Sequence, residues 1–288
     1  MMSAREIVEI INREDHGVAE AVALQSEQIA EAVTLAESAF RAGGRLFYVG
    51  AGTSGRLGVL DASECPPTFG TDPEMVQGII AGGTPALTRS QEGAEDNREA
   101  GSLAMDERHV GPTDFVVGIA ASGTTPYVGA ALARAKELGS RTAIVACSPP
   151  PVLLLSIVDV AIVPIVGPEV VTGSTRMKAG TATKLVLNTI TTGAMIRLGK
   201  TYGNLMVDLR ATNTKLTDRA ERIVAEVCGI SRDEARSILQ RAGGTVKTAI
   251  VMHLLSLPRE DAEHRLSQEG GVIRRVIPHA PPPHPVAP

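Results

Sequence analysis

The sequence predicts an α/β fold in which a doubly wound parallel sheet is flanked by helices on both faces. Four short apolar runs without polar alternation are typical of buried parallel strands, and helix-length segments separate them; the runs are residues 45–49, 114–120, 142–146 and 160–164. After residue 208 the pattern becomes purely helical. A chain of 288 residues is long enough for one large domain and a small annex.

The chain therefore divides into four expected segments. Residues 1–44 form N-terminal helices that pack on the sheet domain, with two helices over 5–41 broken around Asp15-His16-Gly17. Residues 45–208 form the sheet domain, which also contains an expected strand at 75–80 and helices at 95–108, 127–138 and 174–199. Residues 209–277 form the helical annex, and residues 278–288 are a tail too rich in proline to fold.

The annex is expected to hold three short helices and a last one. Their apolar positions recur at helical spacing over 216–228, 231–241, 246–255 and 259–269. Glycines lie between the first three, and Ser231 with Glu234 three residues later is typical of a capping box at a helix N-terminus.

Composition excludes several classes of function. The balance of 28 basic and 32 acidic residues gives a net charge of −4, and there are no Trp, 3 Tyr and 4 Phe, so a nucleic-acid partner is not expected. No apolar run approaches the ~18 residues of a membrane span, and the N-terminus lacks a signal-peptide core, which favours a cytoplasmic location without membrane contact. The three cysteines are far apart, so neither a disulfide nor a metal site is expected.

Two turns are candidate phosphate sites. Gly50-Ala51-Gly52-Thr53-Ser54-Gly55 and Ala121-Ser122-Gly123-Thr124-Thr125-Pro126 each follow a strand and open a helix, where exposed N–H groups and the helix dipole favour an anion. Neither the acid of a dinucleotide site nor a GKS/GKT motif is present, so the hydroxyl-lined turns suit a sugar phosphate better than a nucleotide. The alternative is that they are only tight turns and helix caps.

Two glutamates are candidate catalytic acids or bases. Glu64 lies among small residues just before a Pro66-Pro67 stop, where burial would raise its pKa as a general acid requires. Glu95 belongs to an acidic cluster at the start of a helix, and the alternative is that the helix dipole alone explains it. The six histidines are scattered and suggest no triad.

The unbroken stretch from Gly50 to Thr68, GAGTSGRLGVLDASECPPT, resembles the signature of the N-acetylmuramic acid 6-phosphate etherase family in the sugar isomerase (SIS) domain superfamily. The resemblance continues over residues 7–277, through EGAED at 92–96, GIAASG at 118–123, VTGSTRMKAGT at 171–181 and GNLMVD at 203–208. It implies a SIS-type sheet domain, a ubiquitin-associated-like three-helix annex, a homodimer with sites near its interface, and a lyase that needs neither metal nor organic cofactor.

The resemblance also implies roles for single residues. Such a lyase removes D-lactate from its sugar phosphate by elimination and then adds water, and Glu64 is similar to the residue that protonates the leaving oxygen. Glu95 is similar to the residue acting at C2. Ser54, Ser122 and Thr125 would hold the phosphate with amides around Gly123 and Thr124, although members of the family commonly carry Arg at the position of Thr124.

Two other functions share this pattern. A non-catalytic sugar-phosphate sensor is the first, because the glucokinase regulatory proteins resemble the etherases around the same Gly-Thr-Ser-Gly stretch. Those chains carry two SIS domains, whereas this one has room for one. A sugar-phosphate isomerase is the second, and the Asp61-to-Pro67 run argues against it because that run belongs to the etherase pattern.

Overall fold

The computed structural model describes residues 2–208 and 214–278. Contacts group these residues into two compact units. The first comprises residues 2–64 and 73–193, and the second comprises 65–72, 194–208 and 214–278.

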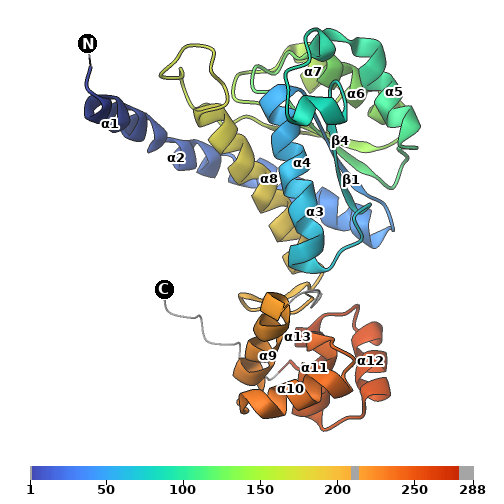
Figure 1. The fold of residues 1–288 in the computed structure, drawn as a ribbon. Coiled ribbons are helices and arrows are strands. Elements are labelled where there is room, and N and C mark those ends of the chain that lie inside the picture. Colours follow the sequence, from blue (N-terminus) through green and yellow to red (C-terminus); the bar gives the residue numbers. More distant parts are fainter. Residues whose placement is uncertain (1, 209–213, 279–288) are drawn as a thin grey trace. The chain divides into compact units, whose positions relative to one another are not determined.

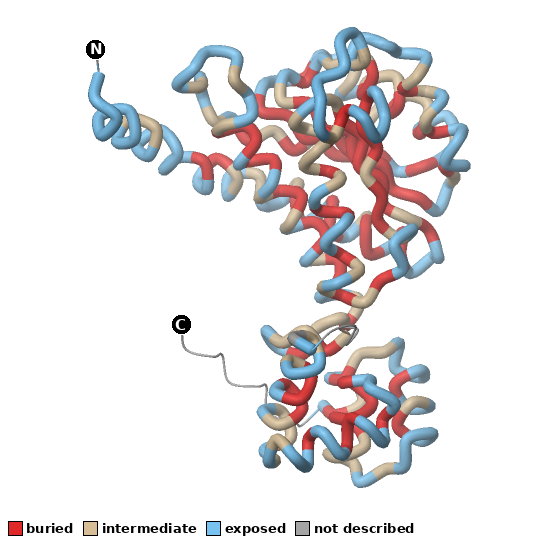
Figure 2. Tube along the Cα trace, viewed as in Figure 1, coloured by how far each residue is buried: buried red, intermediate tan, exposed pale blue. Residues whose placement is uncertain are grey.

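The first unit is built on one five-stranded parallel sheet. Its strands are β1 (Leu46–Gly50), β2 (Val76–Ile80), β3 (Phe115–Ile119), β4 (Arg141–Val145) and β5 (Val160–Ile162). They lie in the order β2-β1-β3-β4-β5, and all pairs are parallel. Figure 1 labels β1 and β4 among the helices that surround the sheet. Figure 2 shows the sheet as the most continuously buried part of this unit. The predicted α/β class and the predicted strands are confirmed.

Helices cover both faces of the sheet. On one face lie α3 (Ser26–Arg41), α4 (Gly52–Phe69) and α8 (Lys178–Arg197), and on the other lie α5 (Arg98–Glu107) and α6 (Pro126–Glu137). Successive strand residues point to opposite faces, so Tyr48 meets the first group whereas Phe47 belongs to the apolar cluster under α6. A Cβ on Gly58 would lie 2.7 Å from the Cβ of Tyr48, so glycine is needed for α4 to approach the sheet this closely.

Short elements complete the first unit. The helices α1 (Ala4–Asp15) and α2 (Val18–Ala23) precede α3, η1 (Thr84–Leu87) and η2 (Ala94–Asp96) are single 3-10 turns, and α7 (Val152–Leu155) is one helical turn. The segment 5–41 thus forms three helices, and the prediction of two is wrong. A second break falls at Gln25, whose backbone leaves the helical range with φ −102° and ψ 17°. The side-chain oxygen of Gln25 accepts a hydrogen bond from the N–H of Val163 at 2.9 Å.

Two other helices begin later than predicted, because side chains cap them. The carboxylate of Glu169 accepts hydrogen bonds from the N–H groups of Lys178 and Ala179, each at 3.0 Å, so α8 begins at Lys178 and not near residue 174. The side chain of Asn97 accepts from the N–H of Ala100, so α5 begins at Arg98, after the separate turn η2.

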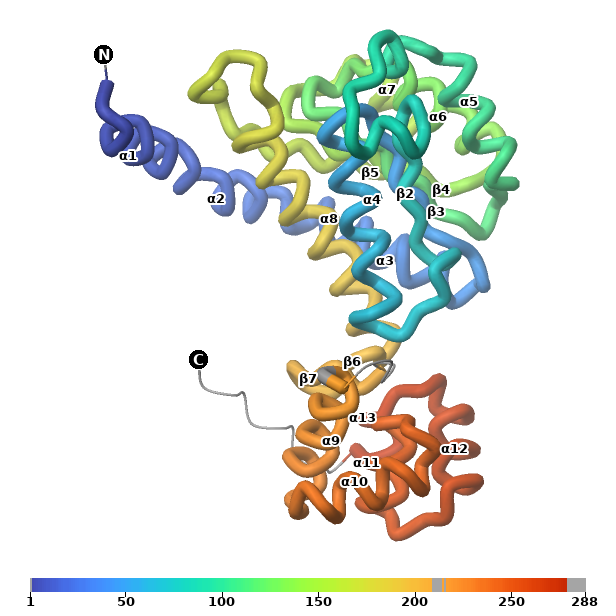
Figure 3. Tube along the Cα trace, viewed as in Figure 1, coloured from blue at the N-terminus to red at the C-terminus, as the bar shows by residue number. Residues whose placement is uncertain are grey.

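The second unit is mainly helical (Figure 3). A two-stranded antiparallel hairpin of β6 (Thr201–Tyr202) and β7 (Leu205–Met206) precedes its helices, which are α9 (Thr214–Cys228), α10 (Arg232–Arg241), α11 (Val246–Leu255), α12 (Arg259–Gln268) and α13 (Ile273–Val276). The four predicted helices and the Ser231–Glu234 capping box are confirmed, whereas the hairpin and α13 were not predicted. The predicted tail, apart from Pro278, lies outside the described residues.

Candidate functional site

The two candidate phosphate turns lie at the same edge of the sheet. They follow β1 and β3, which are neighbouring parallel strands whose last residues, Gly50 and Ile119, are paired in register. Strand order also reverses here, because β2 lies on one side of β1 and β3 on the other. Such a switch point, at the carboxyl ends of parallel strands, is where open α/β sheets bind ligands. Both turns therefore lie at the edge of the sheet where ligands bind in this class of fold.

The first turn leads directly into α4. Gly52 is the first residue of the helix and has a left-handed φ of +51°, which glycine adopts without strain. Ser54 lies in the first helical turn and is partly exposed. Ala51 and Gly52 line a pocket of about 380 Å³, so the start of α4 opens onto a space that a small molecule can occupy.

The second turn presents hydroxyl groups and the start of α6. The oxygen of Ser122 accepts hydrogen bonds from the N–H of Thr124 at 3.2 Å and from the Thr124 hydroxyl at 3.0 Å. Both bonds leave the Ser122 proton available for an acceptor. Gly123 has φ +71°, and a Cβ there would lie 2.9 Å from the Cα of Pro150. Thr125 is the N-cap of α6 but its side chain makes no capping bond, so its hydroxyl is also available.

Glu95 lies beside the first turn. It belongs to η2, is exposed, and lines the 380 Å³ pocket together with Gly52 and Arg56. The guanidinium of Arg56 donates to the carbonyl oxygens of Leu87 at 3.0 Å and Ala86 at 2.8 Å, which holds the η1 segment against the start of α4. The structure therefore brings Glu95 to one of the two predicted phosphate turns.

Glu64 does not share that pocket. It lies on α4, 12 residues after Gly52, which corresponds to about 18 Å along a helix axis. Its side chain is exposed, whereas the sequence predicted that Glu64 would be buried. Within one chain, Glu64 and Glu95 are not brought together.

The predicted Pro66-Pro67 stop is also wrong, because α4 continues to Phe69. Each proline removes only one helical N–H, and both lie in the last turns, where few further bonds are lost. The helix ends instead at Gly70, which has φ +63° and donates its N–H to the carbonyl of Pro66 at 2.9 Å. A left-handed glycine after the last helical residue is a common helix terminator.

Asp61 is a buried acid that the sequence analysis did not single out. It is 5% exposed and accepts hydrogen bonds from the Tyr48 hydroxyl at 2.9 Å, the Thr191 hydroxyl at 3.2 Å and the side-chain amide of Asn188. Burial raises its pKa above the ordinary value of 3.8, although these hydrogen bonds oppose the shift. Asp61 lies three residues after Gly58 and therefore on the same side of α4, which faces the sheet. This spacing could have indicated from the sequence that Asp61 is buried.

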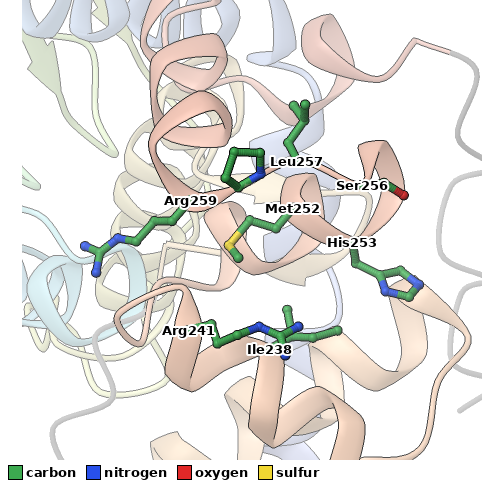
Figure 4. A pocket seen from close by; sticks show the side chains of 8 residues that line it. Ile238, Arg241, Met252, His253, Ser256, Leu257 and Arg259 are labelled. Atoms are coloured by element: carbon green, nitrogen blue, oxygen red, sulfur yellow. The ribbon is translucent and has the colours of Figure 1, made fainter.

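A separate pocket lies wholly within the second unit. It has a volume of about 560 Å³ and is lined by Ile238, Arg241, Met252, His253, Ser256, Leu257, Pro258 and Arg259 (Figure 4). None of the predicted site residues lines it.

Over residues 2–208 and 214–278, no group of three or more His, Cys, Asp or Glu side chains is placed to hold a metal ion. None of the helices described is long and apolar enough to cross a membrane.

Comparisons with known proteins identify close relatives. The family model of the glucokinase regulatory protein N-terminal SIS domain matches residues 28–136, and that of the C-terminal lid domain of glucokinase regulatory protein matches 203–245. An N-acetylmuramic acid 6-phosphate etherase of Rhodopirellula baltica is 54% identical over 276 residues, covering 96% of this chain and 91% of that protein. The N-acetylmuramic acid 6-phosphate etherase 2 of Vibrio cholerae is 52% identical and covers 96% and 90%.

Solved structures are more distant. The phosphoheptose isomerase GmhA from Neisseria gonorrhoeae matches 67% of this chain and 98% of its own with 19% identity and a TM-score of 0.49.

Proposed function

Because the chain belongs to the N-acetylmuramic acid 6-phosphate etherase family, whose members cleave a carbon–oxygen bond, we propose that it converts N-acetylmuramic acid 6-phosphate to N-acetylglucosamine 6-phosphate and D-lactate in cell-wall sugar recycling. The identity of more than half of the residues over 96% of the chain carries this proposal. It favours the etherase over the sensor, whose family models match only residues 28–136 and 203–245. A phosphorylated sugar is a compound of the cell interior, so the proposed location is the cytoplasm.

In the proposed mechanism the ring-opened sugar reacts in two stages. The C1 aldehyde acidifies the C2 proton, Glu95 removes that proton, and the C3–O bond breaks while Glu64 protonates the departing lactate oxygen. Water then adds at C3, with Glu64 taking the proton of the water and C2 recovering a proton from Glu95. Each carboxyl group returns to its starting state, so the cycle needs no oxidant or reductant. No cofactor has a step in this cycle.

The sugar phosphate is proposed to bind at the sheet edge. The hydroxyl groups of Ser54, Ser122 and Thr125 would donate hydrogen bonds to the phosphate oxygens. The backbone N–H groups of Gly123 and Thr124 would donate further hydrogen bonds. The proton of Ser122 that Thr124 leaves available, and the unused hydroxyl of Thr125, support this arrangement.

We further propose a homodimer in which each active site draws on both subunits. Acid and base must contact neighbouring carbons of one sugar, but Glu64 lies about 18 Å along α4 from the helix start that shares a pocket with Glu95. A second copy can supply the missing glutamate. The exposed apolar side chains of α1, with Ile7 at 45% and Val8 at 55% exposure, offer a surface that such a copy would cover.

The test of the proposed reaction is an assay of both products. Purified protein is incubated with N-acetylmuramic acid 6-phosphate, and D-lactate and N-acetylglucosamine 6-phosphate are measured together. We expect equal amounts of the two products from the wild type and a loss of at least 100-fold in rate for Glu64→Gln, because general acid catalysis contributes about 10²–10⁴-fold.

Two controls make this assay specific. Glu27→Gln changes an exposed glutamate on α3 that lines none of the described pockets, and Cys65→Ala removes a buried thiol that the mechanism does not use; both are expected to retain activity. Wild-type turnover by Glu64→Gln would contradict the acid–base assignment. Exchange of the C2 proton without lactate release would indicate an isomerase instead.

A further inference from the structure

A second pocket of the first unit begins at the second phosphate turn and contains one cationic side chain, that of Arg98. The pocket has a volume of about 400 Å³, and its walls include Gly123, Thr124 and Thr125. The remaining lining residues are proline or small or apolar residues from α6, α7 and their neighbouring loops, and none is Asp or Glu. The guanidinium is therefore not neutralised by the walls of its own pocket.

Arg98 has no partner of its own among the residues that the structure describes. It is exposed, and no ion pair or side-chain hydrogen bond is formed by its guanidinium within residues 2–208 and 214–278. Two other arginines of the first unit do form ion pairs, Arg134 with Asp106 at 2.8 Å and Arg45 with Asp114 at 2.8 Å. A packing or ion-pair role within the chain therefore does not explain Arg98.

The position of Arg98 is also unfavourable for a cation. It is the first residue of α5, and the N-terminal end of a helix carries partial positive charge, which favours Asp or Glu there. The helices α5 and α6 pack against each other (Figure 1). Arg98, at the start of α5, lines the same pocket as the turn that opens α6. A negatively charged ligand at the turn would be attracted both by the Arg98 guanidinium and by the positive end of the helix.

The second turn itself lacks charge. Ser122, Thr124 and Thr125 offer hydroxyl groups, whereas a phosphate monoester carries about −1.5 to −2 charges at pH 7. Arg98 supplies the missing counter-charge from a different element, and its planar group can donate two parallel hydrogen bonds to one phosphate.

We infer that Arg98 is a specificity-determining residue that binds the phosphate group at the second turn. This inference rests on the proposed function, because that function supplies the phosphorylated sugar. Arg98 selects the phosphorylated sugar over the free sugar, and it does so without taking part in proton transfer at C2 or C3.

The experiment is calorimetric titration of the full chain with N-acetylglucosamine 6-phosphate, the proposed product, and with N-acetylglucosamine. We expect Arg98→Ala to raise Kd for the phosphorylated sugar at least tenfold, and Arg98→Lys to recover part of that loss, since lysine keeps the charge but not the planar fork. The salt dependence of binding should be weaker in Arg98→Ala than in the wild type. Arg89→Ala removes an exposed arginine of the same unit that lines no described pocket, and its Kd is expected to match the wild type.

A compensating variant provides a second readout. Thr124→Arg places a guanidinium on the turn itself, so in the Arg98→Ala background it should recover part of the affinity. Wild-type binding with an unchanged Kd in Arg98→Ala, while Ser122→Ala loses affinity, would overturn the inference and leave the proposed function standing. Failure of the wild type itself to bind the sugar phosphate would instead contradict the proposed function.

Discussion

At the scale of single residues, the buried carboxylate of Asp61 ties three elements together. It lies on α4 and receives hydrogen bonds from Tyr48 on β1 and from Asn188 and Thr191 on α8. Asp61→Ala would remove the acceptor that these three donors share, at about 1 kcal/mol for each lost hydrogen bond, so we expect it to lower the free energy of unfolding by about 3 kcal/mol. Urea denaturation of both proteins measures this difference, and a loss below about 1 kcal/mol would contradict it.

The pH dependence of stability tests the same residue differently. Because burial raises the pKa of Asp61, the folded state binds more protons than the unfolded state just above pH 3.8, so this contribution to stability falls as pH rises. Asp61→Asn cannot titrate. We therefore expect the stability of Asp61→Asn relative to the wild type to increase from pH 4 upwards, measured by urea denaturation at several pH values. A constant difference would contradict the raised pKa.

The residues of the phosphate turns were predictable because each turn is defined by residues that are adjacent in the sequence. A strand, a small-residue turn and a helix start follow each other within a few residues, so the position of Ser122 or Thr125 can be inferred from the chain alone. The environments of Asp61 and Arg98 depend on residues far away in the sequence, such as Asn188 and Thr124. The exposure of Glu64 likewise depends on which elements pack on its side of α4.

At the scale of elements, α1 is an amphipathic helix with no buried residue in the described chain. Its apolar stripe includes Ile7, Val8 and Ile11, and its C-terminal end is held by an ion pair between Glu14 and the buried Lys178 at 2.8 Å. The helix is therefore anchored at one end and presents its apolar stripe to solvent, as an interface helix would.

The proposed dimer predicts the effect of a charge on that stripe. We expect Ile7→Asp with Val8→Asp to shift the protein from dimer to monomer in sedimentation measurements, with little change in secondary structure, because both side chains are exposed within one chain. Arg5→Ala, which removes only a surface pair with Glu9, is the matched control and should remain dimeric. If the double variant remains a dimer, α1 is not part of the dimer interface.

Helix boundaries show which element features were predictable. Periodicity located α8 and α5, but their first residues depend on capping by Glu169 and Asn97. The end of α4 was misjudged because two prolines in a last turn are tolerated, whereas the left-handed Gly70 ends the helix.

At the scale of the whole molecule, the parallel sheet was predictable because strands buried on both faces are apolar throughout. The order β2-β1-β3-β4-β5 was not, since the same alternation of strands and helices is compatible with several orders. The pairing of β1 with β3, which brings the two turns together, is therefore information that the structure adds.

The shared site predicts that two inactive variants complement each other. A heterodimer of Glu64→Ala and Glu95→Ala has one site with both glutamates intact and one with neither. Mixing equal amounts after subunit exchange should restore about a quarter of wild-type activity, since half of the dimers are mixed and one of their two sites is intact. Continued inactivity after confirmed exchange would contradict a site built from both subunits.

The most direct measurement is the fate of solvent oxygen when N-acetylmuramic acid 6-phosphate is incubated with the protein in ¹⁸O-labelled water. Elimination followed by addition of water at C3 places one labelled oxygen in N-acetylglucosamine 6-phosphate and none in the ether oxygen of D-lactate. We expect mass spectrometry to find the label in the sugar alone. Label in the lactate would show attack at the lactyl carbon, and the absence of lactate would contradict the etherase activity itself.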